Sequence, residues 1–549
     1  MFCSKVIRSL VCIPFILAVD LSPALAQQEF LLGQPTDVGD PDEPITVSPS
    51  DNYETGGSDF GAEIGSSSLE APSVEAAGLA GASALGLDDG MWGETTAKRA
   101  ITLIDAANPT TLYSVNRLLR RVLVAGATPP EGSDGLLASR ARALIRFGAA
   151  EEAASLAGAA GRDPGATLRR ARAEAALIVG RDETLCERDV LGAEAPQNDP
   201  SDKFWPALRA YCLAQTGDPL AAVAVNAMVE LGSVDPTDAA LLEALVDESL
   251  IDYVPVPHAS TLTPLRVAML RSIGRANRPA IESAPLPMIA GLFALESTGA
   301  EGALIAAERL EAVGAIDTEI LREMYISFAN DVERSLGTRA KAVRDADKSP
   351  DAKAMGTALI DAARSSGEGG FAQLARVLAP MAKRLPASKA SELHTVGYAL
   401  RDAMLLGGYA REAGEWSDAQ GARTREERAD VAAVMAVADA DWSREWTRDY
   451  GDTLRLRTRS GDEHARRALA ALAGFGIALR PNLPNEGILK TAREGKVAET
   501  LLSAGAAMGQ ETPLTARTLD TVIRALREIG LEDEARQIAI ETMITERWR

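Results

Sequence analysis

The sequence of 549 residues is acidic and poor in aromatic side chains. It has 78 Asp and Glu against 57 Lys and Arg, and only 4% of its residues are Phe, Trp or Tyr. This length exceeds one ordinary hydrophobic core and indicates several domains or one elongated repeat. The net charge of −21 argues against a general nucleic-acid binder, and three His and four Cys leave little material for a metal site based on those residues.

The first 26 residues have the pattern of a secretory signal. Lys5 and Arg8 precede an apolar run at 10–21, and an Ala-x-Ala site ends at Ala26. The run is too short for a membrane-spanning helix, which needs roughly 20 residues, and no later segment is apolar enough to span. We expect cleavage after Ala26 and export to a bacterial periplasm. A lipoprotein modified at Cys12 is the alternative.

An acidic segment comes next. Residues 27–97 contain 14 acidic residues and no Lys or Arg. Because charge of one sign and low hydrophobicity cannot offset the entropy lost on ordering, we expect a disordered tether over 27–90. Its more apolar end, Leu79 to Trp92, is predicted to dock on the helices after it. A calcium loop is the alternative for the Asp cluster, but the EF-hand ligand spacing is missing.

From Trp92 onward, Ala, Leu, Arg and Glu recur with helical spacing. After Pro109, one helical face collects the apolar residues Leu112, Val115, Leu119, Val122 and Leu123. Near the end of the chain, Thr512 and Pro513 are predicted to cap and open another helix. Gly530 is predicted to end that helix. Asp520 and Arg524 are expected to form a solvated ion pair on its outer face.

A hairpin pattern recurs along the chain: a Gly ends one helix, and five residues later an Ala allows the next helix to approach closely. The instances are Gly148/Ala153, Gly217/Ala222, Gly408/Ala413 and Gly530/Ala535. These features resemble degenerate tetratricopeptide-like (TPR-like) helical repeats, although the 34-residue period is not kept. The chain also resembles uncharacterised exported bacterial helical-repeat proteins. The resemblance implies an all-α fold, an irregular α-solenoid of helical hairpins. Several separate helical bundles are the alternative.

Two proline-rich stretches, 251–287 and 480–485, interrupt the pattern. We therefore expect an N-terminal helical array over 91–250, a middle array over 251–480 and C-terminal hairpins over 481–549.

Cys186 and Cys212 are the cysteines left after the signal is removed. In an exported chain they are expected to form one disulfide, which would stabilise the fold by roughly 3–4 kcal/mol. Two buried thiols or a redox-active pair are the alternatives. The spacing differs from the Cys-x-x-Cys of redox proteins.

Catalytic and cofactor motifs are missing from the sequence. It lacks a complete P-loop, a Gly-x-Ser-x-Gly elbow and a His-Glu-x-x-His zinc motif, so we predict no catalytic residues, cofactor or metal. The three His residues, His258, His394 and His464, are expected to be surface or capping residues. Paired carboxylates are too frequent to indicate a glycosidase by themselves.

One aromatic and basic cluster could be a partner surface. Trp442 and Trp446 stand four residues apart, and four arginines lie between them or after them: Arg444, Arg448, Arg455 and Arg457. Such a cluster could stack on a sugar or bind an acidic peptide. The alternative is that the two Trp side chains pack between hairpins while the arginines face water.

Together these patterns predict a non-catalytic periplasmic scaffold or adaptor. It would bind protein or peptide partners during cell-envelope assembly or maintenance, without nucleic acid, and would associate only indirectly with the cell wall or outer membrane. The alternative is a peptidoglycan-active enzyme, like the superhelical lytic transglycosylases, or a direct activator of one.

Overall fold

The structure is a computed structural model. It describes residues 73–161, 165–187, 203–217, 220–232, 234–254, 256–275, 278–293, 298–365, 370–422, 424–478, 486–510 and 514–548. The predicted signal at 1–26, the predicted tether up to residue 72 and the predicted break at 480–485 lie outside these residues. Residues 72–549 form one compact unit.

The described residues are predominantly helical, as predicted, and their only strands are β1 (Ala80–Gly81) and β2 (Ala125–Gly126), which pair in parallel. The first helices are η2 (Val74–Ala76), η3 (Ser83–Leu85), α1 (Ala97–Ala106), α2 (Tyr113–Val124), α3 (Leu136–Arg146), α4 (Ala150–Gly158), α5 (Ala166–Val179) and α6 (Asp182–Leu185). Next come α7 (Phe204–Gln215), α8 (Leu220–Glu230), α9 (Pro236–Val246), η5 (Glu248–Tyr253), η6 (Ala259–Thr261), α10 (Pro264–Ser272), α11 (Arg278–Ser283) and α12 (Leu286–Leu292).

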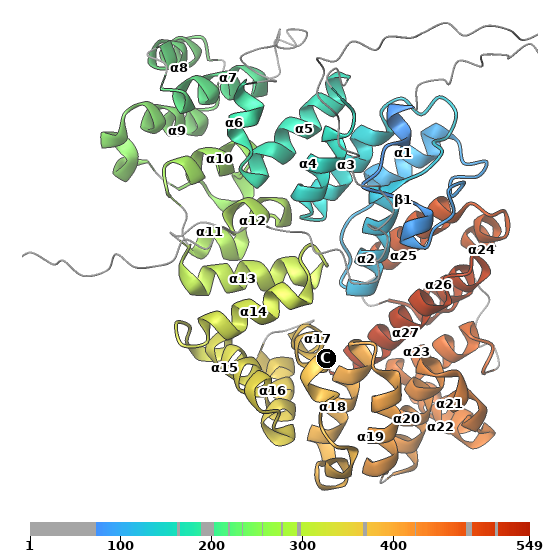
Figure 1. Ribbon diagram of the computed structural model, residues 1–549. Helices are drawn as coiled ribbons and strands as arrows, with labels where there is room; N and C mark the ends of the chain where they lie inside the picture. The colour runs from blue at the N-terminus through green and yellow to red at the C-terminus, as the bar shows by residue number, and fades with distance from the viewer. Residues whose placement is uncertain are drawn as a thin grey trace, which may run out of the picture. The chain divides into compact units, whose positions relative to one another are not determined.

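The second half of the unit continues in the same way. Its helices are α13 (Gly299–Ala312), α14 (Thr318–Phe328), α15 (Arg334–Lys348), α16 (Ala352–Ser365), α17 (Gly370–Ala382), η8 (Ala387–Glu392), α18 (His394–Leu406), α19 (Ala410–Gln420), α20 (Arg425–Ala438), α21 (Ala440–Glu445), α22 (Arg448–Arg459), α23 (Glu463–Gly474), α24 (Glu486–Arg493), α25 (Val497–Gln510), α26 (Ala516–Glu528) and α27 (Glu532–Arg547). Helices that are neighbours in sequence pack against each other along most of this path (Figure 1).

The predicted hairpin signals correspond to real helix ends. Gly148, Gly408 and Gly530 have φ of 75°, 80° and 81°, a left-handed conformation that glycine adopts without strain. The alanines five residues later, Ala153, Ala413 and Ala535, are completely buried, whereas Ala222 is only half-buried. A small side chain at the buried positions lets the paired helices approach.

The C-terminal hairpin corrects two sequence predictions. Helix α26 does not begin at Pro513, because residues 514 and 515 are not helical and the side chain of Thr515 caps the helix. Thr512 and Pro513 themselves lie outside the described residues. Asp520 is completely buried and forms an ion pair of 2.7 Å with Arg524, so this pair is not solvated. A second layer of helices, α23 and α24, covers the face that sequence spacing assigns to solvent.

The segment before α1 is part of the folded unit. As predicted, its apolar end docks: Leu87, Met91 and Trp92 are buried. The Arg140 guanidinium donates hydrogen bonds to the carbonyls of Ala77, Leu123 and Ala125, and burial lowers its pKa to about 10 despite the nearby charge of Glu75. Residues 73–90, which the sequence assigns to the tether, therefore share the core of the helices after them.

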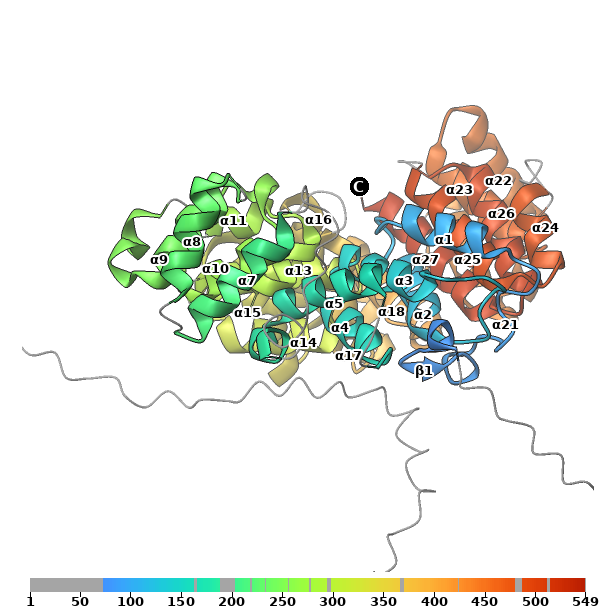
Figure 2. The same cartoon turned by 90° about the horizontal axis from the view of Figure 1, so that it is seen from above.

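The last helices pack against the first ones. Helix α25 contacts α1 and α2, and α27 contacts α2, α17 and α18, as both views show (Figures 1 and 2). We call this junction of α1, α2, α17, α18 and α25–α27 the closure region. Leu119 of α2 lies against Gly505 of α25, and both residues line an apolar cavity of only about 10 Å³.

Candidate functional site

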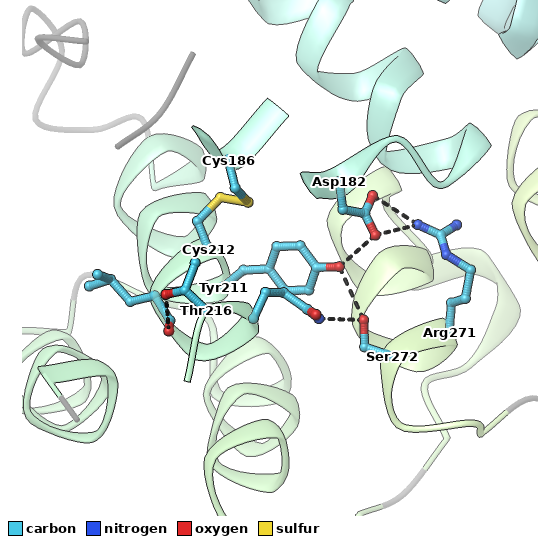
Figure 3. Close-up of a disulfide and its surroundings, with 9 residues drawn as sticks. Asp182, Cys186, Tyr211, Cys212, Thr216, Arg271 and Ser272 are labelled. Atoms are coloured by element: carbon cyan, nitrogen blue, oxygen red, sulfur yellow. Dashed lines mark hydrogen bonds and ion pairs between the residues drawn. A yellow bond between two sulfur atoms is a disulfide. The ribbon is translucent and has the colours of Figure 1, made fainter. Parts of the chain in front are cut away.

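Helix α7 is anchored by the disulfide that the sequence predicts. The sulfurs of Cys186 and Cys212 are bonded, and both residues are buried, at 2% and 0% exposure. The bond ties the residue after α6 to α7 (Figure 3). Because both cysteines are almost completely buried, the geometry is that of a structural bond.

A polar cluster next to the disulfide joins α7 to α6 and α10. The hydroxyl of Tyr211 donates to Asp182 at 2.7 Å and lies 3.1 Å from Ser272, while Arg271 pairs with Asp182 at 2.7 Å (Figure 3). Burial, followed by the negative charge of Asp182, raises the pKa of Tyr211. The phenol therefore stays neutral and acts as a hydrogen-bond donor that fixes α7 in place.

Helix α8 packs mainly against α7 and α9, and it is apolar on two sides. On one side of the helix, Ala221 and Val225 are buried. On the outward side, Leu220, Val223 and Leu231 are 62%, 63% and 77% exposed, and Ala227 is also exposed. At 100° per residue, these four positions fall within about 80° of one another. We call Leu220, Val223, Ala227 and Leu231 the α8 face.

Further exposed apolar side chains follow α8 in the chain. Val246 at the end of α9 is 40% exposed, and Leu250 and Tyr253 in η5 are 36% and 83% exposed. Seven of the ten exposed large apolar side chains in the described residues belong to the stretch 220–253. Single exposed apolar residues are normal on proteins, but a concentration of this kind marks an interaction surface.

The segment that carries this surface is acidic. The stretch 211–265 has no Lys or Arg and contains eight acids, Asp218, Glu230, Asp235, Asp238, Glu243, Asp247, Glu248 and Asp252. Two of these acids are neutralised by the buried Arg266, and Asp252 lies 3.6 Å from Arg275. Glu230, Glu243 and Glu248 are exposed and have no ion pair within the described residues. The basic residues that come directly before this acidic stretch are Arg209 in α7 and Lys203 at the N-cap of α7.

The four arginines of the predicted partner surface do not share one environment. Arg444 and Arg448 are highly exposed, with Asp441 and Asp452 as their neighbours at 3.1 and 3.7 Å. Arg455 also pairs with Asp452, at 2.8 Å. Aspartates therefore already accompany this basic surface.

Arg457 faces the helix contacts instead of the surface. Its guanidinium lies 2.7 Å from both Asp430 and Asp462, and its side chain is 21% exposed. Burial lowers its pKa, but the charges of Asp430 and Asp462 and the hydrogen bonds to both together outweigh burial, so the net shift is upward. The residue links α20, α22 and α23.

Trp442 and Trp446 are both half-buried against the core. The indole nitrogen of Trp442 lies over Gly414, where a Cβ would approach it to 3.0 Å. Trp446 packs against Tyr450 with ring centroids 5.8 Å apart. Each ring is therefore packed on one part and exposed on another. Helix α21 ends before Trp446, so the two Trp residues do not lie on one helix.

Every buried carboxylate in the described residues has an arginine partner. Arg376 of α17 binds Glu311 through two hydrogen bonds of 2.9 and 3.0 Å and lies 3.6 Å from Glu541. The remaining pairs are Asp402 with Arg401 and Arg547, Glu499 with Arg99, and Asp520 with Arg524. Burial raises the pKa of Asp402, but Arg401 and Arg547 outweigh it and hold the pKa below 3.8. A general acid needs the opposite shift.

Two of the three histidines have the predicted roles. His258 caps η6, and His394 is exposed at the start of α18. His464 differs from the prediction, because it is half-buried and its Nε2 lies 3.6 Å from Asp430. Among the described residues, no three or more His, Cys, Asp or Glu side chains gather where they could hold a metal ion.

None of the helices in the described ranges combines the length and apolar character that a membrane span requires. The chain matches no protein-family model, no curated protein and no solved structure.

Sequence reasoning missed the α8 face, although a signal for it was present. Residues 220–231 contain only two polar side chains, Asn226 and Glu230. A helix that is apolar all round is buried on every side or offers one side to a partner. Which of these applies depends on how many helices cover it, and α8 has two main neighbours.

Proposed function

We propose that this protein is a non-catalytic adaptor that binds another protein through the α8 face. The observation that carries the proposal is the stripe of exposed Leu220, Val223, Ala227 and Leu231 on α8, which packs against α7, the helix that the disulfide anchors. Apolar surface gains about 25 cal/mol for each Å² removed from water, so a contiguous exposed stripe favours association. A rigid base reduces the entropy lost when a partner binds.

The proposal includes a fold and a location. We infer an irregular TPR-like solenoid that is exported by its N-terminal signal and acts in the periplasm, in cell-envelope assembly or maintenance. The recurrent Gly/Ala hairpin pattern supports the repeat architecture. The apolar run with its Ala-x-Ala site supports export, and the buried disulfide fits an oxidising compartment.

The pairing of buried acids supports a role without catalysis. Glu311, Asp402 and Glu541 each face an arginine in the packed interior. A glycosidase would need one carboxyl group in a cleft with a raised pKa. In this protein, buried carboxylates serve helix-to-helix contacts.

Site-specific photo-crosslinking in the producing cell tests the proposal. A photoreactive residue at Ala227 should give a crosslinked partner, and the substitution Leu231→Asp should abolish it. The same residue placed at Leu456, which is 67% exposed on α22, is the matched control and should not capture that partner. Absence of an Ala227-specific product, or an equal product from both positions, would contradict the proposal.

A further inference from the structure

The geometry of the α8 face matches a helical partner. Val223, Ala227 and Leu231 are spaced at i, i+4 and i+8, and Leu220 lies one turn before Val223. Such a stripe is the surface against which a second helix packs its own apolar row. From Leu220 to Leu231 the stripe is about 16 Å long at 1.5 Å per residue, or roughly three turns.

The negative charge near the α8 face favours a partner whose polar side chains are basic. Glu230 directly precedes Leu231, Glu243 lies on the neighbouring α9, and Glu248 lies in η5 next to the exposed end of α9. All three carboxylates are exposed. A partner with Lys or Arg beside its apolar row would be attracted to this surface, and an acidic one would be repelled.

The same charge argument disfavours occupants supplied by the chain or by lipid. Residues 27–97 are acidic without a single Lys or Arg, so they would be repelled. Two copies joined through this face would bring two acidic segments together. An anionic membrane surface would be repelled as well.

We propose that the α8 face binds an amphipathic helix of another protein, with an apolar row flanked by Lys or Arg. This inference rests on the proposed adaptor function and specifies the partner. Apolar contact supplies most of the affinity, and the acidic rim supplies orientation and selectivity.

Peptide binding to the purified full-length chain tests the inference. The probe is a fluorescein-labelled helical peptide of about 18 residues, with Leu at i, i+3 and i+7 and Lys at the flanking positions. A second peptide has Glu in place of Lys. Fluorescence anisotropy should show binding of the Lys peptide and at least about tenfold weaker binding of the Glu peptide.

Variants of the chain show where the peptide binds. Val223→Asp and Leu231→Asp should each weaken the Lys peptide by about tenfold or more, whereas Leu456→Asp should leave it unchanged. Glu230→Lys combined with Glu243→Lys should weaken binding in about 0.05 M salt, and the difference should shrink in about 0.5 M salt. Equal binding of both peptides, or indifference to the α8 variants, would overturn the inference.

The photo-crosslink at Ala227 separates this inference from the adaptor function. Mass spectrometry of the crosslinked segment should identify a basic amphipathic helix. A crosslink to an acidic or extended segment, or to a second copy of this chain, would overturn the partner chemistry and leave the α8 face as a binding surface. Loss of the crosslink altogether would contradict both.

Discussion

The closure region and the region of α7–η5 use the same residue types in opposite ways. In the closure region, charged side chains are buried and apolar residues such as Leu119, at 1% exposure, are covered. Around α8, apolar residues such as Leu231 are exposed, and acids such as Glu243 face water. One region uses its surface for intramolecular contacts, and the other leaves an apolar face available. The difference indicates where the protein gains stability and where it can bind.

Buried charges in the closure region connect segments that are distant in sequence. The carboxylate of Glu541 accepts hydrogen bonds of 2.8 Å from the backbone amides of Tyr113 and Ser114, at the start of α2. Leu112 supplies no side-chain cap there. A carboxylate from α27 therefore satisfies amides that α2 itself leaves open, and its charge suits the positive end of the helix.

The largest expected effect comes from Asp402. Its carboxylate binds Arg401, Arg547 and, at 2.8 Å, the indole nitrogen of Trp548. Asp402→Asn should lower the free energy of unfolding by about 3–5 kcal/mol, because it leaves buried arginines without their countercharge. Chemical denaturation measures this loss. Asp441→Asn, at a pair that is 81% exposed on both sides, is the control and should change stability by less than about 0.5 kcal/mol.

The next largest loss of stability is expected from removing the disulfide, which lies in the region of α7–η5. Replacing Cys186 and Cys212 by Ser should remove about 3–4 kcal/mol, since the bond closes a loop with a sequence separation of 26. Hydrogen exchange should accelerate in α7–α9 and stay unchanged in α25–α27. Equal acceleration in both regions would show that α7–α9 is not a separate unit of stability.

A matched pair of leucines compares the two regions directly. Leu119→Ala should cost about 3 kcal/mol, because it enlarges an apolar cavity at the contact of α2 with α25. Leu231→Ala removes the same atoms from a side chain that is 77% exposed, and it should change stability by less than about 0.5 kcal/mol. Denaturant midpoints of the two variants give the comparison, and similar losses would mean that the α8 face is covered in solution.

Acid should weaken the closure region and the neighbouring helix α20 by a smaller amount. The pKa of Asp402 is lowered in the folded state, and so is that of Asp430, where His464, Arg547 and Arg457 outweigh burial. A lowered pKa stabilises the fold at pH values above the ordinary 3.8 and ceases to do so as the pH falls through the folded value. Denaturation midpoints should therefore be flat from pH 7 to about 5 and fall below about pH 4. A decline that begins near pH 6 would point to histidine.

The smallest effect on stability belongs to the α8 face. Leu231→Asp should leave the free energy of unfolding within about 0.5 kcal/mol of the natural chain, while abolishing the crosslink from Ala227. Circular dichroism during denaturation measures the first quantity. A large loss of stability would assign Leu231 to the core and remove it from the proposed binding surface.

Short-range sequence rules account for the local structure of this protein. Helical spacing identified α2 and its buried face, and Gly530 marked the end of α26. The cysteine count identified the disulfide of Cys186 with Cys212. These features depend on residues close in sequence, or on two cysteines that can pair in only one way, so the sequence alone is enough to predict them.

Which helical faces are covered was decided at the level of tertiary structure. Periodicity shows that Asp520 lies opposite the apolar face of α26, but the helices α23 and α24 bury that side. Glu541 and Tyr113 are 428 residues apart, and no local pattern links them. The α8 face is the converse case: its side chains are apolar, but no helix in the described residues covers them. Burial depends on contacts between distant segments, and a spacing rule contains no information about them.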